Sequence, residues 1–186
     1  GLVYFASEKG KILTEMTATR LGEDEFLMMT GAGAYWHDRD LLNFNLPGDS
    51  SISISDVTSE MATLLVTGPN APAVMADLSG EGMGHDEFPW LTYRQMEIAG
   101  VRVTAIRVSF AGEAGWELHC DMGDVTALYE AVWAAGSSHN IGNFGMLALD
   151  SMRLEKGYRS WKADRTSDYT MLESGLARWV NLGKED

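Results

Sequence analysis

The sequence predicts an α+β protein built from mostly antiparallel sheets with interspersed helices. Two strand-like segments, 91–98 and 101–110, are separated only by Ala99-Gly100, which is a two-residue hairpin signal. Other segments alternate apolar and polar residues, or are short apolar runs that stop at a glycine, as strands do. Segments with helical spacing or helix-capping signals lie between them, and the chain has no internal repeat.

The first part of the chain combines strands with two helices. Residues 11–21, "KILTEMTATRL", alternate and contain threonines that favour a strand. The other strands expected here directly follow residue 1 or lie at 25–31, 51–58 and 61–68. Helices are expected at 33–46 and 70–78, the second with Asn70 as its cap and Pro72 in its first turn.

The second part follows the same plan. After the hairpin, "GWELHC" is expected to form one more strand. A helix over 124–136 is expected to start at the N-cap Asp124 and to end at a glycine. A last helix over 144–156 is expected to stop near Gly157, which places the residues beyond it in a loop.

Composition limits the classes of function. The 186 residues are 45% hydrophobic, which is enough for one sizeable core or two small ones. A net charge of −13 argues against a nucleic-acid partner, because phosphate binding relies on basic surface. The single cysteine, Cys120, and the lack of a long apolar run or a leader favour an intracellular protein without a membrane segment. We expect it in the cytoplasm, or in the mitochondrial matrix of a eukaryote.

Motif searches leave few residues that could carry chemistry. The sequence has no Gly-x-Gly-x-x-Gly or phosphate loop, no nucleophile elbow, and no histidine spacing typical of a metal site. No metal is therefore expected. The remaining candidates are carboxylates and aromatics: Glu15, Trp90, Phe110, Glu113, Trp116 and Glu117.

The segment "RVSFAGEAGWELHC" (107–120) places two of these carboxylates around a turn. Glu113 lies in the turn and Glu117 in the strand that follows. Because side chains alternate along a strand, Trp116 and Leu118 are expected to face the core while Glu117 faces the opposite side. That side is either solvent or a ligand cleft, and the strand pattern alone does not choose between them.

Five of the 14 cations fall within 13 residues: Arg153, Lys156, Arg159, Lys162 and Arg165. Such a run is usually a solvated face with salt bridges. The alternative is a binding surface for an anionic ligand tail or for an acidic neighbouring domain.

Five motifs in order carry a resemblance to a known family. They are "GKILTEMTATRL", "VTGPNAPAVM", "RVSFAGEAGWELHC", "LDSMRLEKGYRSW" and "YTMLESGLARWV". The chain resembles the folate-binding aminomethyltransferase family, which includes the T-protein of the glycine cleavage system. It looks most like the folate domains of dimethylglycine and sarcosine dehydrogenases. The resemblance implies that residues 1–186 are the folate-binding region of a longer multidomain chain with a flavin domain and a C-terminal barrel.

The resemblance also implies roles for individual residues. Glu117 would contact the pterin ring of tetrahydrofolate, and Glu15 would be the catalytic carboxylate. Trp90 and Phe110 match positions where the family places aromatics near the folate, and ordinary core packing is the alternative explanation. The remaining residues implied in folate binding are Glu113, Arg153 and Trp179.

The expected activity is one-carbon transfer to tetrahydrofolate, from a methylated amine or another aminomethyl donor. The resemblance implies tetrahydrofolate as cofactor, with FAD in a covalently linked flavin-oxidoreductase domain. Two alternatives remain open. One is a non-catalytic folate-fold module that packs on a flavin domain, and the other is a folate-dependent demethylase.

Three positions depart from the family pattern. Glu15, followed by methionine, stands where the family usually has aspartate followed by leucine, and a displacement of ~1 Å can cost ~10²-fold in rate. Phe110 stands where tyrosine is frequent. Leu149 replaces an arginine of T-proteins, which favours the dehydrogenase branch.

Overall fold

The computed structural model describes residues 1–181 and 183. The chain divides into two compact units, one formed by Gly1–Ser55 together with the chain from Arg159 onward, the other by Asp56–Tyr158. Each unit contains one antiparallel sheet, and the described residues include four α-helices. The predicted α+β class with antiparallel sheets is therefore confirmed.

The first unit is built on a three-stranded sheet. Its strands are β1 (Leu2–Ala6), β2 (Ile12–Arg20) and β3 (Phe26–Met29), in the order β1-β2-β3. The strands expected after residue 1 and within 11–21 and 25–31 are thus confirmed. In the register of β1 and β2, Tyr4 lies directly opposite Glu15, so both side chains project from the same face.

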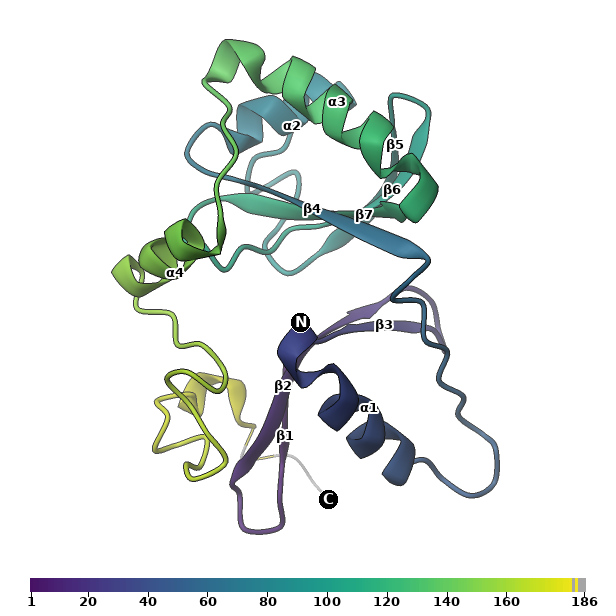
Figure 1. Cartoon of the computed structure of the whole chain (residues 1–186), viewed down its shortest axis with the longest axis vertical. Helices are drawn as coiled ribbons and strands as arrows, with labels where there is room; N and C mark the ends of the chain where they lie inside the picture. Colours follow the sequence, from purple (N-terminus) through teal and green to yellow (C-terminus); the bar gives the residue numbers. More distant parts are fainter. Residues whose placement is uncertain (182, 184–186) are drawn as a thin grey trace. The chain divides into compact units, whose positions relative to one another are not determined.

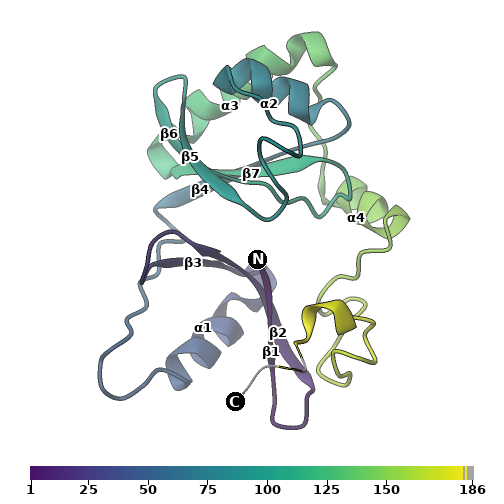
Figure 2. The same cartoon turned by 180° about the vertical axis from the view of Figure 1, so that it is seen from behind.

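The first unit is discontinuous in sequence, because one part of it precedes the second unit and another part follows it. Helix α1 (Tyr35–Phe44) follows β3 after a short 3-10 helix and confirms the helix expected at 33–46. The C-terminal segment lies beside β1 and β2 (Figure 2), where the amide of Ile12 donates to the carbonyl of Tyr169 at 3.0 Å. Ile12, Met171 and Leu176 form the buried apolar cluster of this unit.

The strand expected at 51–58 is wrong. No strand forms among these residues, and Ile52 and Ile54 are both exposed. Alternation of isoleucine and serine has the period of a strand, but strand preference depends on packing against cross-strand neighbours and a buried face. Ile52 and Ile54 have neither cross-strand neighbours nor a buried face. The segment connects the two units instead.

The second unit contains a four-stranded antiparallel sheet. Its strands are β4 (Met61–Thr67), β5 (Tyr93–Ile98), β6 (Val101–Ile106) and β7 (Gly115–Asp121), in the order β4-β7-β6-β5. Ala99 and Gly100 both have positive φ, 51° and 82°, which is the geometry of a tight hairpin turn. The predicted hairpin is confirmed.

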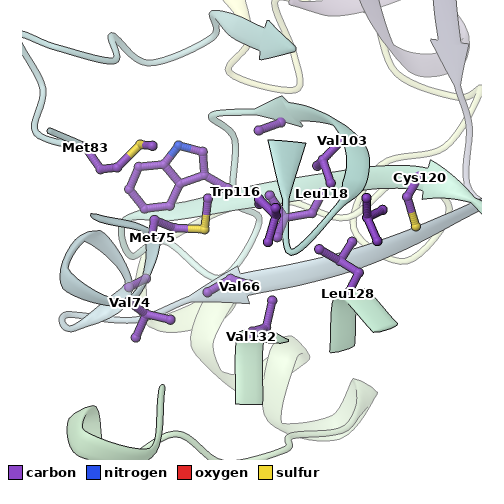
Figure 3. Close-up of a cluster of buried hydrophobic side chains, with 14 of the residues drawn as sticks. Val66, Val74, Met75, Met83, Val103, Trp116, Leu118, Cys120, Leu128 and Val132 are labelled. Carbon is purple, nitrogen blue, oxygen red and sulfur yellow. The ribbon is translucent and has the colours of Figure 1, made fainter. Parts of the chain in front are cut away.

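Helices α2 (Ala71–Ser79) and α3 (Val125–Gly136) lie together on one face of this sheet (Figure 1). Trp116 and Leu118 of β7 point toward these helices and are fully buried, and Leu128 of α3 packs on them (Figure 3). Burial of one such large apolar side chain contributes ~1.5–3 kcal/mol. The core of the unit therefore lies between the sheet and the two helices.

Both predicted helix caps are wrong in detail. Neither Asn70 nor Asp124 makes a side-chain cap, since each already has a helix-like backbone rather than the extended backbone of a capping residue. The side-chain Nδ2 of Asn70 instead donates to the carbonyl of His139 at 3.1 Å. The last helix, α4 (Met146–Glu155), ends just before Gly157 as expected, with φ of 78° at that glycine.

No helix in the described part of the chain is long and apolar enough to cross a membrane.

Candidate functional site

The turn that precedes β7 requires two of its glycines. Gly112 has φ of 83°, and a Cβ placed on it would lie 2.5 Å from the Cβ of Lys156. A Cβ on Gly115 would lie 2.7 Å from the Cβ of Ser109 and 2.9 Å from the hydroxyl of Thr67. Any larger residue would push these neighbours apart, so the turn is packed as closely as a protein interior.

Glu117 projects from the sheet face opposite the helices. Its neighbours along the strand, Trp116 and Leu118, are fully buried, whereas the side chain of Glu117 is 29% exposed. The predicted alternation is confirmed. Across the sheet, Glu117 pairs with Leu65 of β4 and Ile106 of β6, so apolar side chains flank the carboxylate on both sides.

A histidine that sequence analysis had not linked to Glu117 lies beside it. His119 is buried on the same strand face, and its Nε2 lies 3.4 Å from the Glu117 carboxylate. Its Nδ1 is 2.9 Å from the hydroxyl of Thr63 on β4. The sequence signal for this pairing was that Glu117 and His119 are two residues apart on one strand, because such residues share a face of the sheet.

Two of the three aromatics implied in folate binding, Phe110 and Trp90, are not core residues. Phe110 is 38% exposed and Trp90 is 48% exposed, so the core-packing explanation is wrong for both. Phe110 stacks on Tyr158, with ring centroids 6.2 Å apart and an interplanar angle of 16°. Tyr158 was not singled out from the sequence. Glu113 lies exposed in the turn.

Arg153 is buried rather than solvated. Its guanidinium lies 2.6 Å from the Asp150 carboxylate and donates to the carbonyl of Tyr158 at 3.0 Å. Phe110 and Arg153 are thereby connected through Tyr158. Arg165 is buried too. The expectation that the cation run forms one solvated face is therefore wrong, and its members belong to two different units.

Glu15 lies in the first unit, on β2, with a side chain that is 17% exposed. The Nη2 of Arg165 is 2.6 Å from its carboxylate. The Nη1 of Arg165 donates to the Tyr4 hydroxyl at 2.8 Å, and its guanidinium carbon lies 5.4 Å from the Tyr4 ring centroid. Tyr4 lies directly opposite Glu15 in the pairing of β1 with β2. Arg165 thus contacts both members of this cross-strand pair.

The protonation of Tyr4 follows from this environment. Burial raises the pKa of the Tyr4 hydroxyl well above its ordinary value. The bond from Arg165 lowers it by less, and the neighbouring negative charge of Glu15 raises it again. The phenol therefore keeps its proton at neutral pH.

Trp179 also belongs to the first unit. It closes a short 3-10 helix (Ala177–Trp179), is partly buried against the Ile12 cluster, and has the Arg178 guanidinium 4.9 Å from its ring centroid. Its predicted folate contact stays a prediction, as do those of the residues in the second unit. Within residues 1–181 and 183, no three His, Cys, Asp or Glu side chains are grouped so that they could hold a metal ion.

Comparison with known families gives one match over nearly the whole chain. The model of the GCVT N-terminal domain matches residues 1–184. The chain belongs to this family. Tetrahydrofolate binding is what membership of the GCVT family implies.

Several curated proteins are similar to this GCVT domain. Human mitochondrial dimethylglycine dehydrogenase is 36% identical over 97% of the chain, and human mitochondrial sarcosine dehydrogenase 35% over 84%. The regulatory subunit of mouse mitochondrial pyruvate dehydrogenase phosphatase is 32% identical over 96%. The chain spans 21%, 17% and 20% of these three relatives, respectively. The resemblance to the two dehydrogenases is thereby confirmed.

The fold of this GCVT domain also matches a solved structure. Aminomethyltransferase T of the glycine cleavage system from Bartonella henselae superposes with a TM-score of 0.78 at 27% identity. The match covers 96% of this chain and 46% of that protein. The α+β architecture described above is thus that of an aminomethyltransferase.

Proposed function

We propose that this chain is the folate-binding part of an enzyme that transfers a one-carbon unit to tetrahydrofolate, of the dimethylglycine or sarcosine dehydrogenase type. The observation that carries the proposal is the position of Glu117. A closely packed turn precedes it, apolar neighbours flank it, and its carboxylate is left partly exposed.

The chemistry of Glu117 suits a pterin. A carboxylate can accept two parallel hydrogen bonds, one from the pterin amide nitrogen and one from its exocyclic amine. The Nε2 of its neighbour His119 lies 3.4 Å from the carboxylate, which is too long for a strong hydrogen bond. Glu117 therefore retains acceptor capacity for a ligand.

Exposed aromatic surface in the same unit supports the proposal. Phe110 and Tyr158 form a stacked pair whose first ring is partly open, and Trp90 presents a half-exposed indole. A pterin is a flat, weakly polar ring system that gains from stacking on such faces. In this proposal these aromatics cover the pterin while Glu117 fixes its edge.

Glu15 is proposed as the carboxylate that serves the one-carbon chemistry. It would face the cationic iminium or the folate nitrogens and help to organise proton transfer there. The oxidised methylamine would come from a flavin domain in the longer protein that the dehydrogenase relatives suggest. Dimethylglycine and sarcosine are the donors to test first.

Calorimetric titration with tetrahydrofolate tests the binding half of the proposal. Glu117→Gln should keep the fold and lose much of the affinity, because a neutral amide cannot accept both hydrogen bonds. Glu97→Gln is the matched control, since Glu97 is an exposed glutamate on β5 of the same sheet. Equal affinity of all three proteins would remove Glu117 from the folate site.

A second candidate function has its own observation. The carboxylate of Glu15 is already paired with a buried arginine, so its charge is offset within its own unit. This favours a module that keeps the fold without the chemistry, and one relative is named as a regulatory subunit. Thermal shift separates the candidates: tetrahydrofolate at ~100 times its dissociation constant adds ~2.7 kcal/mol of stability to a binder and nothing to a module that has lost the site.

A further inference from the structure

We propose that Arg165 is a positioning residue for Glu15 and that Tyr4 shares this task, so that the carboxylate is oriented and charge-balanced before any ligand arrives. The inference rests on the proposed one-carbon transfer, because it concerns the carboxylate that this chemistry would use. It concerns one unit only, since all three residues lie in the first unit.

The contacts around Glu15 define its orientation. Arg165 reaches the carboxylate with Nη2 at 2.6 Å and the Tyr4 hydroxyl with Nη1 at 2.8 Å. Tyr4 is the cross-strand neighbour of Glu15, and its ring lies against the same guanidinium. A guanidinium that is itself held by Tyr4 offers the carboxylate an ionic partner at one fixed position.

The arginine itself is fixed by a tightly bonded loop. The amide of Lys162 donates to the carbonyl of Arg165 at 2.7 Å, and the amide of Ser160 donates to the Asp164 carboxylate at 2.8 Å. Nη2 of Arg165 also donates to the carbonyl of Arg159. A loop closed by these bonds presents the guanidinium in one place, and its buried position excludes competing water.

This arrangement limits what Glu15 can do. A carboxylate that shares a buried guanidinium has little net charge to offer a distant cation. Its contribution then comes from accepting a hydrogen bond in a fixed direction from an N–H of the bound folate or amine. Reactions of this kind are sensitive to geometry, and ~1 Å of displacement can cost ~10²-fold in rate.

Two substitutions separate positioning from mere stabilisation. Arg165→Lys keeps a cation for Glu15 but lacks the fork that reaches Glu15 and Tyr4 together. Arg165→Met removes the cation. Both are assayed in the longest form of the protein that contains this chain, with tetrahydrofolate and dimethylglycine, and in parallel with sarcosine. Turnover, folate affinity and melting temperature are measured on the same samples.

If Arg165 positions Glu15, Arg165→Lys regains most of the melting temperature lost in Arg165→Met, while turnover stays ~10²-fold below wild type. Folate affinity stays within about threefold, because the proposed pterin contact lies at Glu117. If turnover returns in step with the melting temperature, Arg165 only stabilises the fold and the inference is wrong. The melting curve of Arg165→Lys shows whether this variant is folded under the assay conditions.

Tyr4 supplies a readout that needs no folate. Tyrosine ¹³Cζ resonances report ionisation of each phenol, and Tyr4→Phe identifies the Tyr4 signal. Removal of the negative charge in Glu15→Gln should let Tyr4 ionise at lower pH than in wild type, and loss of the cation in Arg165→Met should delay it.

The two readouts distinguish two failures. An unchanged Tyr4 signal in both variants contradicts the contacts among Glu15, Arg165 and Tyr4 and overturns the inference, whatever the enzyme does. A Tyr4 signal that shifts as expected in a protein without any turnover contradicts the proposed function, and with it the role of Arg165 in a reaction.

Discussion

The two candidate carboxylates of this protein are satisfied in different ways. Glu15 in the first unit has a buried guanidinium at 2.6 Å and Tyr4 as its cross-strand neighbour. Glu117 in the second unit has one histidine at 3.4 Å and is nearly twice as exposed, at 29% against 17%. The first carboxylate has an internal ionic partner in close contact, whereas the contact of the second is longer, at 3.4 Å against 2.6 Å.

The difference separates two kinds of functional carboxylate. A charge that is taken out of water requires compensation, and an internal cation provides it permanently. A carboxylate that is meant to recognise a ligand loses specificity if the protein already occupies its lone pairs. We therefore expect substitutions around Glu15 to act mainly on stability and geometry, and substitutions around Glu117 mainly on affinity.

The largest expected effect is that of Arg165→Met on stability. Loss of the guanidinium leaves Glu15 without its ionic partner in a largely buried place, and breaking a buried pair costs ~3–5 kcal/mol. Chemical denaturation followed by circular dichroism measures the free energy of unfolding. The double variant Glu15→Gln with Arg165→Met should recover much of the loss, and no recovery would mean that Arg165 acts through packing alone.

A smaller effect is expected from His119→Gln. Glutamine keeps a polar side chain near Thr63 and Glu117, so the change should cost ~1 kcal/mol, the net value of one hydrogen bond. The same denaturation experiment measures it. A loss as large as that of Arg165→Met would show Glu117 to be as firmly paired as Glu15, and the contrast between the two sites would disappear.

The smallest effect appears only in alkaline solution. Because the pKa of Tyr4 is raised in the folded protein, the unfolded chain loses this proton first, and stability from Tyr4 declines as pH rises above about 10. Above that pH, the melting temperature of wild type should therefore fall more steeply with pH than that of Tyr4→Phe. Below pH 9 the difference between the two proteins should be constant. Parallel melting-temperature curves over the whole pH range would mean that Tyr4 is exposed to solvent in the folded protein.

Local patterns predicted most of the fold. Strand alternation around Glu117 and the hairpin at Ala99-Gly100 depend on neighbouring residues only, and both were found as expected. The segment 51–58 has the same local pattern as a strand. It failed because pairing needs a partner strand and a buried face, and neither is encoded in the segment itself.

The candidate site was predicted only as a set of residues. The resemblance of the motifs pointed to Glu15 and Glu117, but their partners depend on contacts between distant segments. Arg165 lies 150 positions after Glu15 in the sequence, and it was counted as one of a surface run. Tyr4 meets Glu15 through strand register, which no single motif contains.

The first unit is assembled from both ends of the chain, since the second unit occupies Asp56–Tyr158 without interruption. On a ribosome, the second unit is complete before the segment that carries Arg165 has been synthesised. Until Arg165 has been synthesised, Glu15 has no ionic partner. The nascent sheet of the first unit therefore carries an uncompensated carboxylate during that time. Prior folding of the second unit shortens the flexible chain that must close, which reduces the entropy lost when Arg165 reaches Glu15. We therefore expect truncation before Arg165 to spare the second unit and to deprive the first of its ion pair.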